Sequence, residues 1–169
     1  PITANLLRQS IIQWMAGSPL PAMQASKTAH GLIAAWLKEN ASGKPVITVT
    51  LRRTKYANTM RNSRLDAWGA FVQSLKEKYC VIFLDDFDFV FDRPPPGFED
   101  CKTLPSTMFS IELRSSLYQH AMLNLLVGNG PMALCTTNCY CRFLIFMNFD
   151  EQDKAQNYTT SLSQALRRG

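Results

Sequence analysis

Short apolar runs alternate with segments of helical periodicity along most of the chain, and this alternation limits the folds open to it. The runs are rich in β-branched residues and apolar almost throughout, as in VITVTL and CVIFL. Strands of this kind are covered on both faces, which is typical of parallel sheets. Helices between parallel strands imply right-handed crossovers. The pattern therefore predicts an α/β fold with three layers, a Rossmann-like parallel sheet with helices on both faces.

The sequence also suggests where the elements lie. We expect strands at about 46–51, 80–85, 122–127 and 142–147, with a fifth short strand at 87–91 left open. Helical spacing over 4–15 and 22–40 predicts an N-terminal helix pair that breaks at GSPLP. Further helices are expected over 63–79 with Ser63 as N-cap, over 111–122, after Pro131 and over 150–168. The prediction is a single α/β domain in which a helical segment at 1–42 precedes a core at 45–169.

Composition indicates a globular protein with an anionic partner. Hydrophobic residues make up 46% of the 169 residues and charged residues 18%, which excludes disordered and collagen-like classes. The sequence has neither an apolar run of membrane-spanning length nor signal-peptide features, so we expect a cytoplasmic protein without membrane contact. The net charge of +5 favours a phosphate-bearing small molecule or nucleic acid. Because the basic residues are spread along the chain, nucleic acid is the weaker choice.

Cysteine and histidine residues offer no recognisable chemistry. The five cysteines are an odd number, which argues against a disulfide framework. Cys135, Cys139 and Cys141 have a spacing that matches no paired zinc motif, so we expect small buried side chains and no metal site. His30 and His120 fall in expected helices without a neighbouring nucleophile. No common nucleotide-binding or hydrolase motif occurs, so we predict no cofactor and assign no catalytic residue.

Ligands of open parallel sheets bind outside the carboxyl ends of the strands, so residues that follow the strands are the candidates. The candidates in the loop after the first strand are Arg52, Arg53, Arg61, Asn62 and Ser63. An arginine that reaches inward can bind phosphate through two hydrogen bonds, whereas a solvated strand end is the alternative. Asp85 and Asp86 follow the second strand, where a solvated turn is the favoured interpretation.

The sequence GNGP follows the third strand and favours a tight loop that leads into a short helix. Gly128, Asn129 and Gly130 would let a ligand approach the backbone closely. The N–H groups of Gly130, Met132 and Ala133 would then point at a bound anion. The alternative is an ordinary turn, because Gly, Asn and Pro form turns without any ligand.

Four stretches follow one another in a familiar order: VITVTLRR, RNSRLDAWGAF, LYQHAMLNLLVGNGPMALC and RFLIF. This order resembles the carboxyl-terminal, nucleotide-sugar-binding half of GT-B-type glycosyltransferases and related uncharacterised bacterial glycosyltransferase-like proteins. The resemblance spans about residues 46–147. It implies that Arg52 contacts the diphosphate of a nucleotide sugar, that Asn129 and Gly130 cover the phosphates, and that Asn62 and Ser63 support them.

A GT-B enzyme has two Rossmann-like domains, whereas a chain of this length has room for one. The resemblance therefore implies a glycosyltransferase-like domain that binds a nucleotide sugar or other phosphate-bearing ligand, with a missing partner domain or subunit if it is an enzyme. The alternatives are a non-catalytic interaction or assembly domain and a nucleic-acid-binding domain, because a fold alone does not determine function. A homodimer through Trp14 and Trp36 is a further expectation, since large aromatic side chains on helices suit interfaces.

Overall fold

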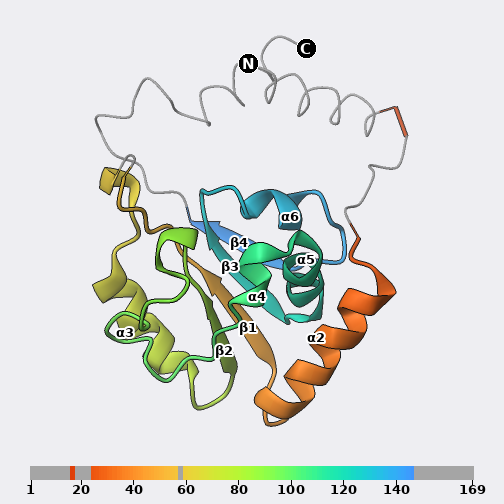
Figure 1. Cartoon of the computed structure of the whole chain (residues 1–169), viewed down its shortest axis with the longest axis horizontal. Helices are drawn as coiled ribbons and strands as arrows, with labels where there is room; N and C mark the ends of the chain where they lie inside the picture. The colour runs from red at the N-terminus through yellow and green to blue at the C-terminus, as the bar shows by residue number, and fades with distance from the viewer. Residues whose placement is uncertain (1–15, 18–23, 57–58, 147–169) are drawn as a thin grey trace. The chain divides into compact units, whose positions relative to one another are not determined.

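The structure is a computed structural model that describes residues 16–17, 24–56 and 59–146. Four strands within the compact unit Met23–Asn148 form one sheet in the order β2-β1-β3-β4 (Figure 1). They are β1 (Val46–Thr50), β2 (Cys80–Leu84), β3 (Leu123–Val127) and β4 (Phe143–Phe146). All pairings are parallel. The four expected strands are confirmed to within one residue at each end.

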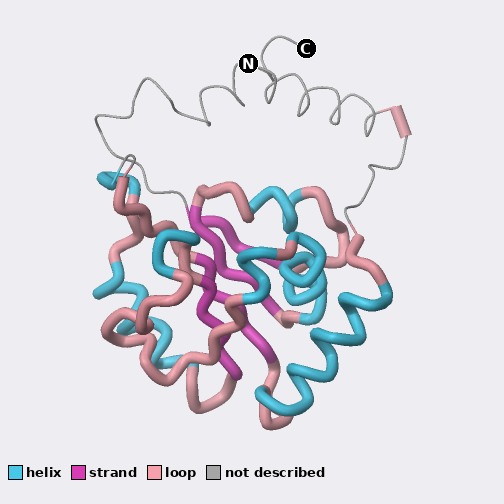
Figure 2. Tube along the Cα trace, viewed as in Figure 1, coloured by secondary structure: helices cyan, strands magenta, loops and turns pink. Residues whose placement is uncertain are grey.

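Helices cover both faces of this sheet, as Figures 1 and 2 show. On one face lie α2 (Lys27–Asn40), α5 (Ile111–His120) and α6 (Met132–Thr136), and on the other lies α3 (Leu65–Leu75). The short α4 (Ser106–Phe109) leads into α5. The predicted three-layer α/β fold is confirmed. None of the described helices is both long and apolar enough to cross a membrane.

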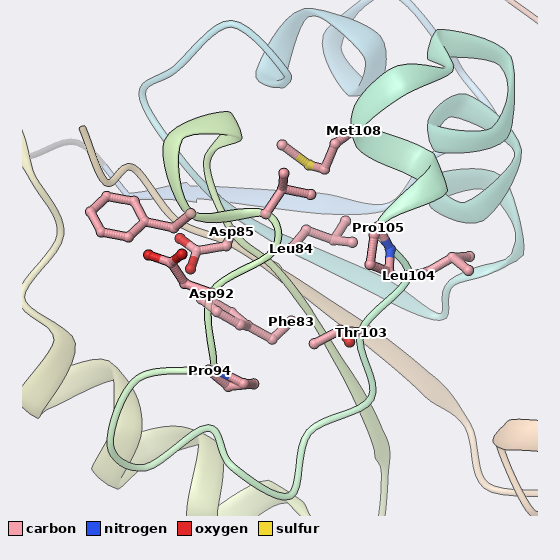
Figure 3. A pocket seen from close by; sticks show the side chains of 11 residues that line it. Phe83, Leu84, Asp85, Asp92, Pro94, Thr103, Leu104, Pro105 and Met108 are labelled. Carbon is pink, nitrogen blue, oxygen red and sulfur yellow. The ribbon is translucent and has the colours of Figure 1, made fainter. Parts of the chain in front are cut away.

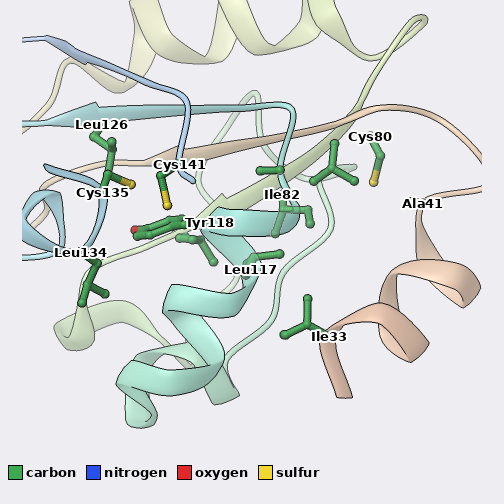
Figure 4. Close-up of a cluster of buried hydrophobic side chains, with 13 residues drawn as sticks. Ile33, Ala41, Cys80, Ile82, Leu117, Tyr118, Leu126, Leu134, Cys135 and Cys141 are labelled. Atoms are coloured by element: carbon green, nitrogen blue, oxygen red, sulfur yellow. The ribbon is translucent and has the colours of Figure 1, made fainter. Parts of the chain in front are cut away.

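Alternate residues of the strands supply two cores. Ile47 and Val49 of β1 pack beneath α3, and the core on the opposite face gathers around Tyr118 and Leu117 of α5 (Figure 4). The buried polar residues of this second face satisfy one another. Thr48 Oγ1 donates to Asn124 Oδ1 at 2.7 Å, and Asn124 Nδ2 donates to the carbonyl oxygen of Tyr118 at 2.9 Å.

Two local expectations are wrong. Residues 87–89 form a 3-10 helix, η2, instead of a fifth strand, because the carboxylate of Asp86 accepts a hydrogen bond from Phe87 N at 2.9 Å and turns the chain. Ser63 is not the N-cap of α3, since Arg64 occupies that position. The Ser63 hydroxyl instead accepts a hydrogen bond from Arg52 N at 3.1 Å.

The N-terminal helix pair is described only in part. The expected helix over 22–40 begins at Lys27, after Ser26, whose hydroxyl accepts a hydrogen bond from Ala29 N at 3.2 Å. Trp36 is partly buried against the core. The expected helices over 4–15 and 150–168, together with Trp14, lie outside the described residues. The single-domain organisation and the homodimer therefore stay predictions.

The close contact between Gly97 and Gly69 should be essential for stability. Gly97 has φ +88°, and a Cβ there would lie 2.8 Å from Gly69 Cα. We expect Gly97→Ala to lower the free energy of unfolding by about 1–3 kcal/mol. The matched control is Gly31→Ala in α2, where a Cβ would meet no atom within 4 Å. This control should raise stability by about 0.5–1 kcal/mol. Urea denaturation measures both, and equal effects would contradict the prediction.

The contact between α2 and α5 should make stability depend on pH. His30 Nδ1 lies 3.2 Å from His120 Nε2. Burial, and then the neighbouring His30, lower the pKa of His120. The unfolded chain therefore takes up this proton first, so stability is complete above about pH 6.5 and falls as pH decreases below it. Urea denaturation between pH 7 and 5 should show this loss in the wild type and less of it in His120→Gln. Equal slopes would contradict the assignment.

Candidate functional site

The order of the strands reverses beside β1, and this reversal creates the candidate site. The chain passes from β1 to its neighbour β2 across the α3 face, and then returns past β1 to β3 across the α5 face. The loops that leave β1 and β3 at their carboxyl ends therefore turn toward opposite faces. In open α/β sheets ligands bind at this point, and we call the region between the two loops the crevice.

The loops after β1 and β3 meet at the crevice. Arg61 Nη2 lies 3.5 Å from the carbonyl oxygen of Gly128, and Asn129 Nδ2 lies 3.5 Å from that of Leu51. Both are long hydrogen bonds. Arg52 follows Leu51 directly, so its backbone lies beside the GNGP loop. The structure thus brings together two groups of residues that the sequence placed in separate loops.

Asn129 presents a buried acceptor at this crevice. Its side-chain Oδ1 is inaccessible to solvent and makes no hydrogen bond to the described residues. Beside it, Gly130 is exposed, and a Cβ added there would meet no atom within 4 Å. A buried polar atom without a partner costs free energy, whereas a bound donor removes that cost. The loop therefore combines an enclosed, unsatisfied acceptor at Asn129 with open space beside Gly130.

The backbone donors expected from GNGP are mostly engaged. Met132 N donates to the carbonyl oxygen of Asn129 at 3.2 Å, and Ala133 N donates to that of Gly130 at 3.1 Å. Within the described chain, Gly130 N is the expected donor that has no backbone partner. The expected cradle of three N–H groups is wrong in this respect, because a tight turn into a short helix uses its own first donors. An anion bound at this loop would therefore be held mostly by side chains.

Arg53 lies in an ion pair beside the crevice. Its guanidinium pairs with the carboxylate of Asp85 and lies 3.8 Å from the ring centroid of Phe89. The two charged side chains are only 15% and 11% exposed. Burial raises the pKa of Asp85, while the N–H of Asp86 and the charge of Arg53 oppose that shift. The solvated turn expected at Asp85 is wrong, because the two strand ends bring opposite charges together.

Asn62 and Ser63 organise the loop after β1. The amide of Asn62 accepts from Thr54 N and donates to Thr54 O, both at 3.0 Å. Ser63 holds Arg52 in a similar way, since Ser63 N donates to Arg52 O at 2.8 Å. Asp88 also accepts hydrogen bonds from Thr54 Oγ1 and Lys55 N. These contacts hold in place the loop that carries Arg52 and Arg53.

A small pocket of about 50 Å³ lies at the carboxyl end of β2 (Figure 3). Asp85 and Asp92 line one side, and Pro105 and Met108 line the other. Three exposed aromatic rings lie near it, with the Phe109 centroid 5.5 Å from that of Phe87 and 5.7 Å from that of Phe91. Sequence reasoning missed this pocket because most of its residues come from loops that lack a periodic pattern.

Sequence reasoning also missed a buried polar chain behind the crevice. Arg114 Nε donates to Tyr118 Oη at 3.1 Å, and Tyr118 Oη lies 2.8 Å from Thr50 Oγ1, at the end of β1. Arg114 occupies a core-facing helical position together with Leu117 and Tyr118. A charged residue in the apolar stripe of a helix was the signal that could have found it.

The cysteines contribute to packing. Cys135 and Cys141 are buried in the core beneath α6 with their side chains near each other (Figure 4), while Cys139 is exposed. The neighbouring Cys141 thiol, and then burial, raise the pKa of Cys135. Among the described residues, no group of three or more His, Cys, Asp or Glu side chains could hold a metal ion.

Comparison with known proteins supports the fold. No protein-family model matches the sequence, and no curated protein matches it. A solved structure does match, that of the glycosyl transferase family 9 from Veillonella parvula DSM 2008. The TM-score is 0.56 at 8% sequence identity, and the match covers 88% of this chain and 54% of that chain. The chain therefore has a glycosyltransferase-like, Rossmann-like fold and spans about half the length of its structural neighbour.

The Arg53–Asp85 pair should stabilise the carboxyl edge of the sheet. Asp85→Ala would leave the guanidinium buried without its carboxylate, at a cost of about 3 kcal/mol in the free energy of unfolding. The control is Asp92→Ala, whose partner is Lys55 at 3.6 Å with side chains 53% and 43% exposed. That change should cost less than about 1 kcal/mol. Similar losses in urea denaturation would show that the buried pair has no special role.

Proposed function

We propose that this chain binds a nucleotide sugar, or another ligand that carries phosphate, in the crevice between β1 and β3. The observation that carries the proposal is the meeting of the Arg52–Arg61 loop with the GNGP loop at the reversal of strand order. The glycosyltransferase-like fold supports it, because the structural neighbour is a glycosyl transferase.

The residues of the crevice have separate roles in this proposal. Arg52 contacts the diphosphate, and Arg61 holds the GNGP loop in place beside it. The buried Asn129 Oδ1 accepts a hydrogen bond from a hydroxyl or N–H group of the ligand, because an amide oxygen cannot bind a phosphate oxygen directly. Gly128, Gly130 and Met132 leave the ligand access to the loop.

Arg53, Asn62 and Ser63 support the site in this proposal. The guanidinium of Arg53 is already paired with Asp85, while Asn62 and Ser63 hold the backbone at Thr54 and Arg52. A transferase reaction would require a second domain or subunit, since the chain covers 54% of the neighbour's length. The proposed ligand site therefore supplies one wall of a larger active site.

A second candidate function is an interaction or assembly domain on the same scaffold. The observation that favours it is the exposed aromatic group Phe87, Phe91 and Phe109, whose side chains are 59%, 81% and 56% exposed. Large apolar surfaces of this kind commonly bind other proteins. A mass that rises with protein concentration in sedimentation would support this alternative.

Thermal denaturation with UDP, GDP, ADP and CMP sugars distinguishes these functions. Because binding to the folded state raises Tm, one nucleotide class should raise it at millimolar concentration. No shift with any of these ligands would contradict the proposal. A salt-sensitive mobility shift with oligonucleotides would instead support the nucleic-acid alternative.

Arg52→Ala should weaken binding of the effective nucleotide sugar by about ten- to a hundredfold, which corresponds to one lost charged hydrogen bond of roughly 1.5–3 kcal/mol. Circular dichroism of the variant checks that the fold persists. The control is Arg142→Ala, which removes an exposed charge just before β4, at the opposite edge of the sheet. Equal small losses in calorimetric titration would mean that only the general positive charge matters.

A further inference from the structure

Arg114 of α5 is a buried cation that the described chain does not neutralise. Its exposed fraction is 7%. The four ion pairs among the described residues involve other side chains, and none includes Arg114. The hydrogen bond from Arg114 Nε reaches Tyr118 Oη at 3.1 Å. The guanidinium carbon also lies 5.9 Å from the centroid of the Tyr118 ring. A phenol is a dipole and not a counter-charge, so no carboxylate among the described residues balances the charge of Arg114.

The contact with Tyr118 uses only Nε of the guanidinium. The two Nη groups donate to none of the described residues, and they are not among the buried polar atoms that lack a partner. Burial raises the pKa of Tyr118, which keeps its hydroxyl neutral. A guanidinium presents a fork of N–H donors that matches a phosphate group. The Nη groups are therefore the part of Arg114 that an anion would contact.

The position of Arg114 suggests where that anion would lie. Tyr118 Oη lies 2.8 Å from Thr50 Oγ1, and Thr50 is the last residue of β1. The guanidinium is therefore held near the carboxyl end of β1, on the face covered by α5 and α6. The helix α5 packs against α6, the helix that the GNGP loop enters. Figure 4 shows Tyr118 between α5 and the side chains of Leu134 and Cys135.

The N-terminus of α5 adds to this positive field. Ser110 caps the helix by accepting a hydrogen bond from Leu113 N, and Arg114 follows within the next turn. The positive end of the helix dipole and the guanidinium therefore lie close together. The helix α5 follows β2 and precedes β3 in the chain, and it runs antiparallel to both strands. The N-terminus of α5 therefore lies at the carboxyl edge of the sheet.

We propose that Arg114 binds a second anionic group of the ligand, a phosphate, from the α5 side of the crevice that Arg52 borders. This inference rests on the proposed function and adds a residue and a charge requirement to it. Two arginines on different elements favour a ligand with two adjacent phosphates over a ligand with one. Tyr118 and Thr50 are positioning residues that hold the guanidinium in place.

The experiment uses the full chain with inorganic pyrophosphate and, separately, inorganic phosphate as probes. The wild type should bind pyrophosphate more tightly than phosphate in calorimetric titration. Arg114→Met should weaken pyrophosphate binding about tenfold or more and abolish that preference. Its Tm without ligand checks that the variant is folded. Arg114→Lys, which keeps the charge, should retain part of the pyrophosphate affinity.

The following outcomes would overturn the inference. Unchanged pyrophosphate affinity in Arg114→Met would show that the ligand does not reach it. If Arg52→Ala alone loses pyrophosphate, the proposed function stands and the role of Arg114 is structural. If the wild type binds neither pyrophosphate nor any nucleotide sugar, both proposals fail together.

Discussion

The central position of β1 is the constraint on which the rest of the structure depends. Every residue of β1 is buried, and the strand pairs with β2 on one side and β3 on the other. Right-handed crossovers to neighbours on opposite sides must pass over opposite faces. The chain therefore places α3 on one face and α5 on the other, and the loops at the carboxyl end of the strand separate there. The crevice is a consequence of the order in which the strands are connected, and no particular loop sequence is needed to form it.

Two threonines of β1 connect the core with this edge. Thr48 is hydrogen-bonded to Asn124, and Thr50 contacts the hydroxyl of Tyr118. In a strand covered on both faces, a threonine has the β-branched shape that packing favours and a hydroxyl that requires a partner. The partners come from β3 and α5, so each hydrogen bond joins layers of the domain. The same bonds set the position of Arg114 behind the crevice.

Arginine residues at the carboxyl edge differ in what surrounds them. A carboxylate and an aromatic ring enclose Arg53, which makes it part of the scaffold. Arg61 lies against the backbone of the GNGP loop. Arg114 is buried beside a neutral phenol. The side chain type is the same in each case, so the neighbouring groups decide whether the charge stabilises the fold or remains for an anion.

The sequence by itself determined the strands, their parallel arrangement and the edge of the sheet at which the candidate residues lie. These features depend on local periodicity and β-branched composition, which any stretch of chain carries with it. The local sequence did not predict the structure where two local structures compete. At 87–91 the residues favoured a strand, but the side chain of Asp86 stabilises a 3-10 helix.

Only the tertiary structure decided which side chains meet. Arg53 pairs with the carboxylate of a residue 32 positions further along the chain. Ser63 accepts a hydrogen bond from Arg52 N and does not cap the helix that follows it. In the turn at GNGP, backbone carbonyl groups accept hydrogen bonds from N–H groups that the sequence had suggested for a ligand. Arg114 is buried because the side of α5 that carries it packs against the sheet. Such contacts depend on the distance between segments that are far apart in the chain. Residue type and spacing carry no information about that distance until the layers are packed.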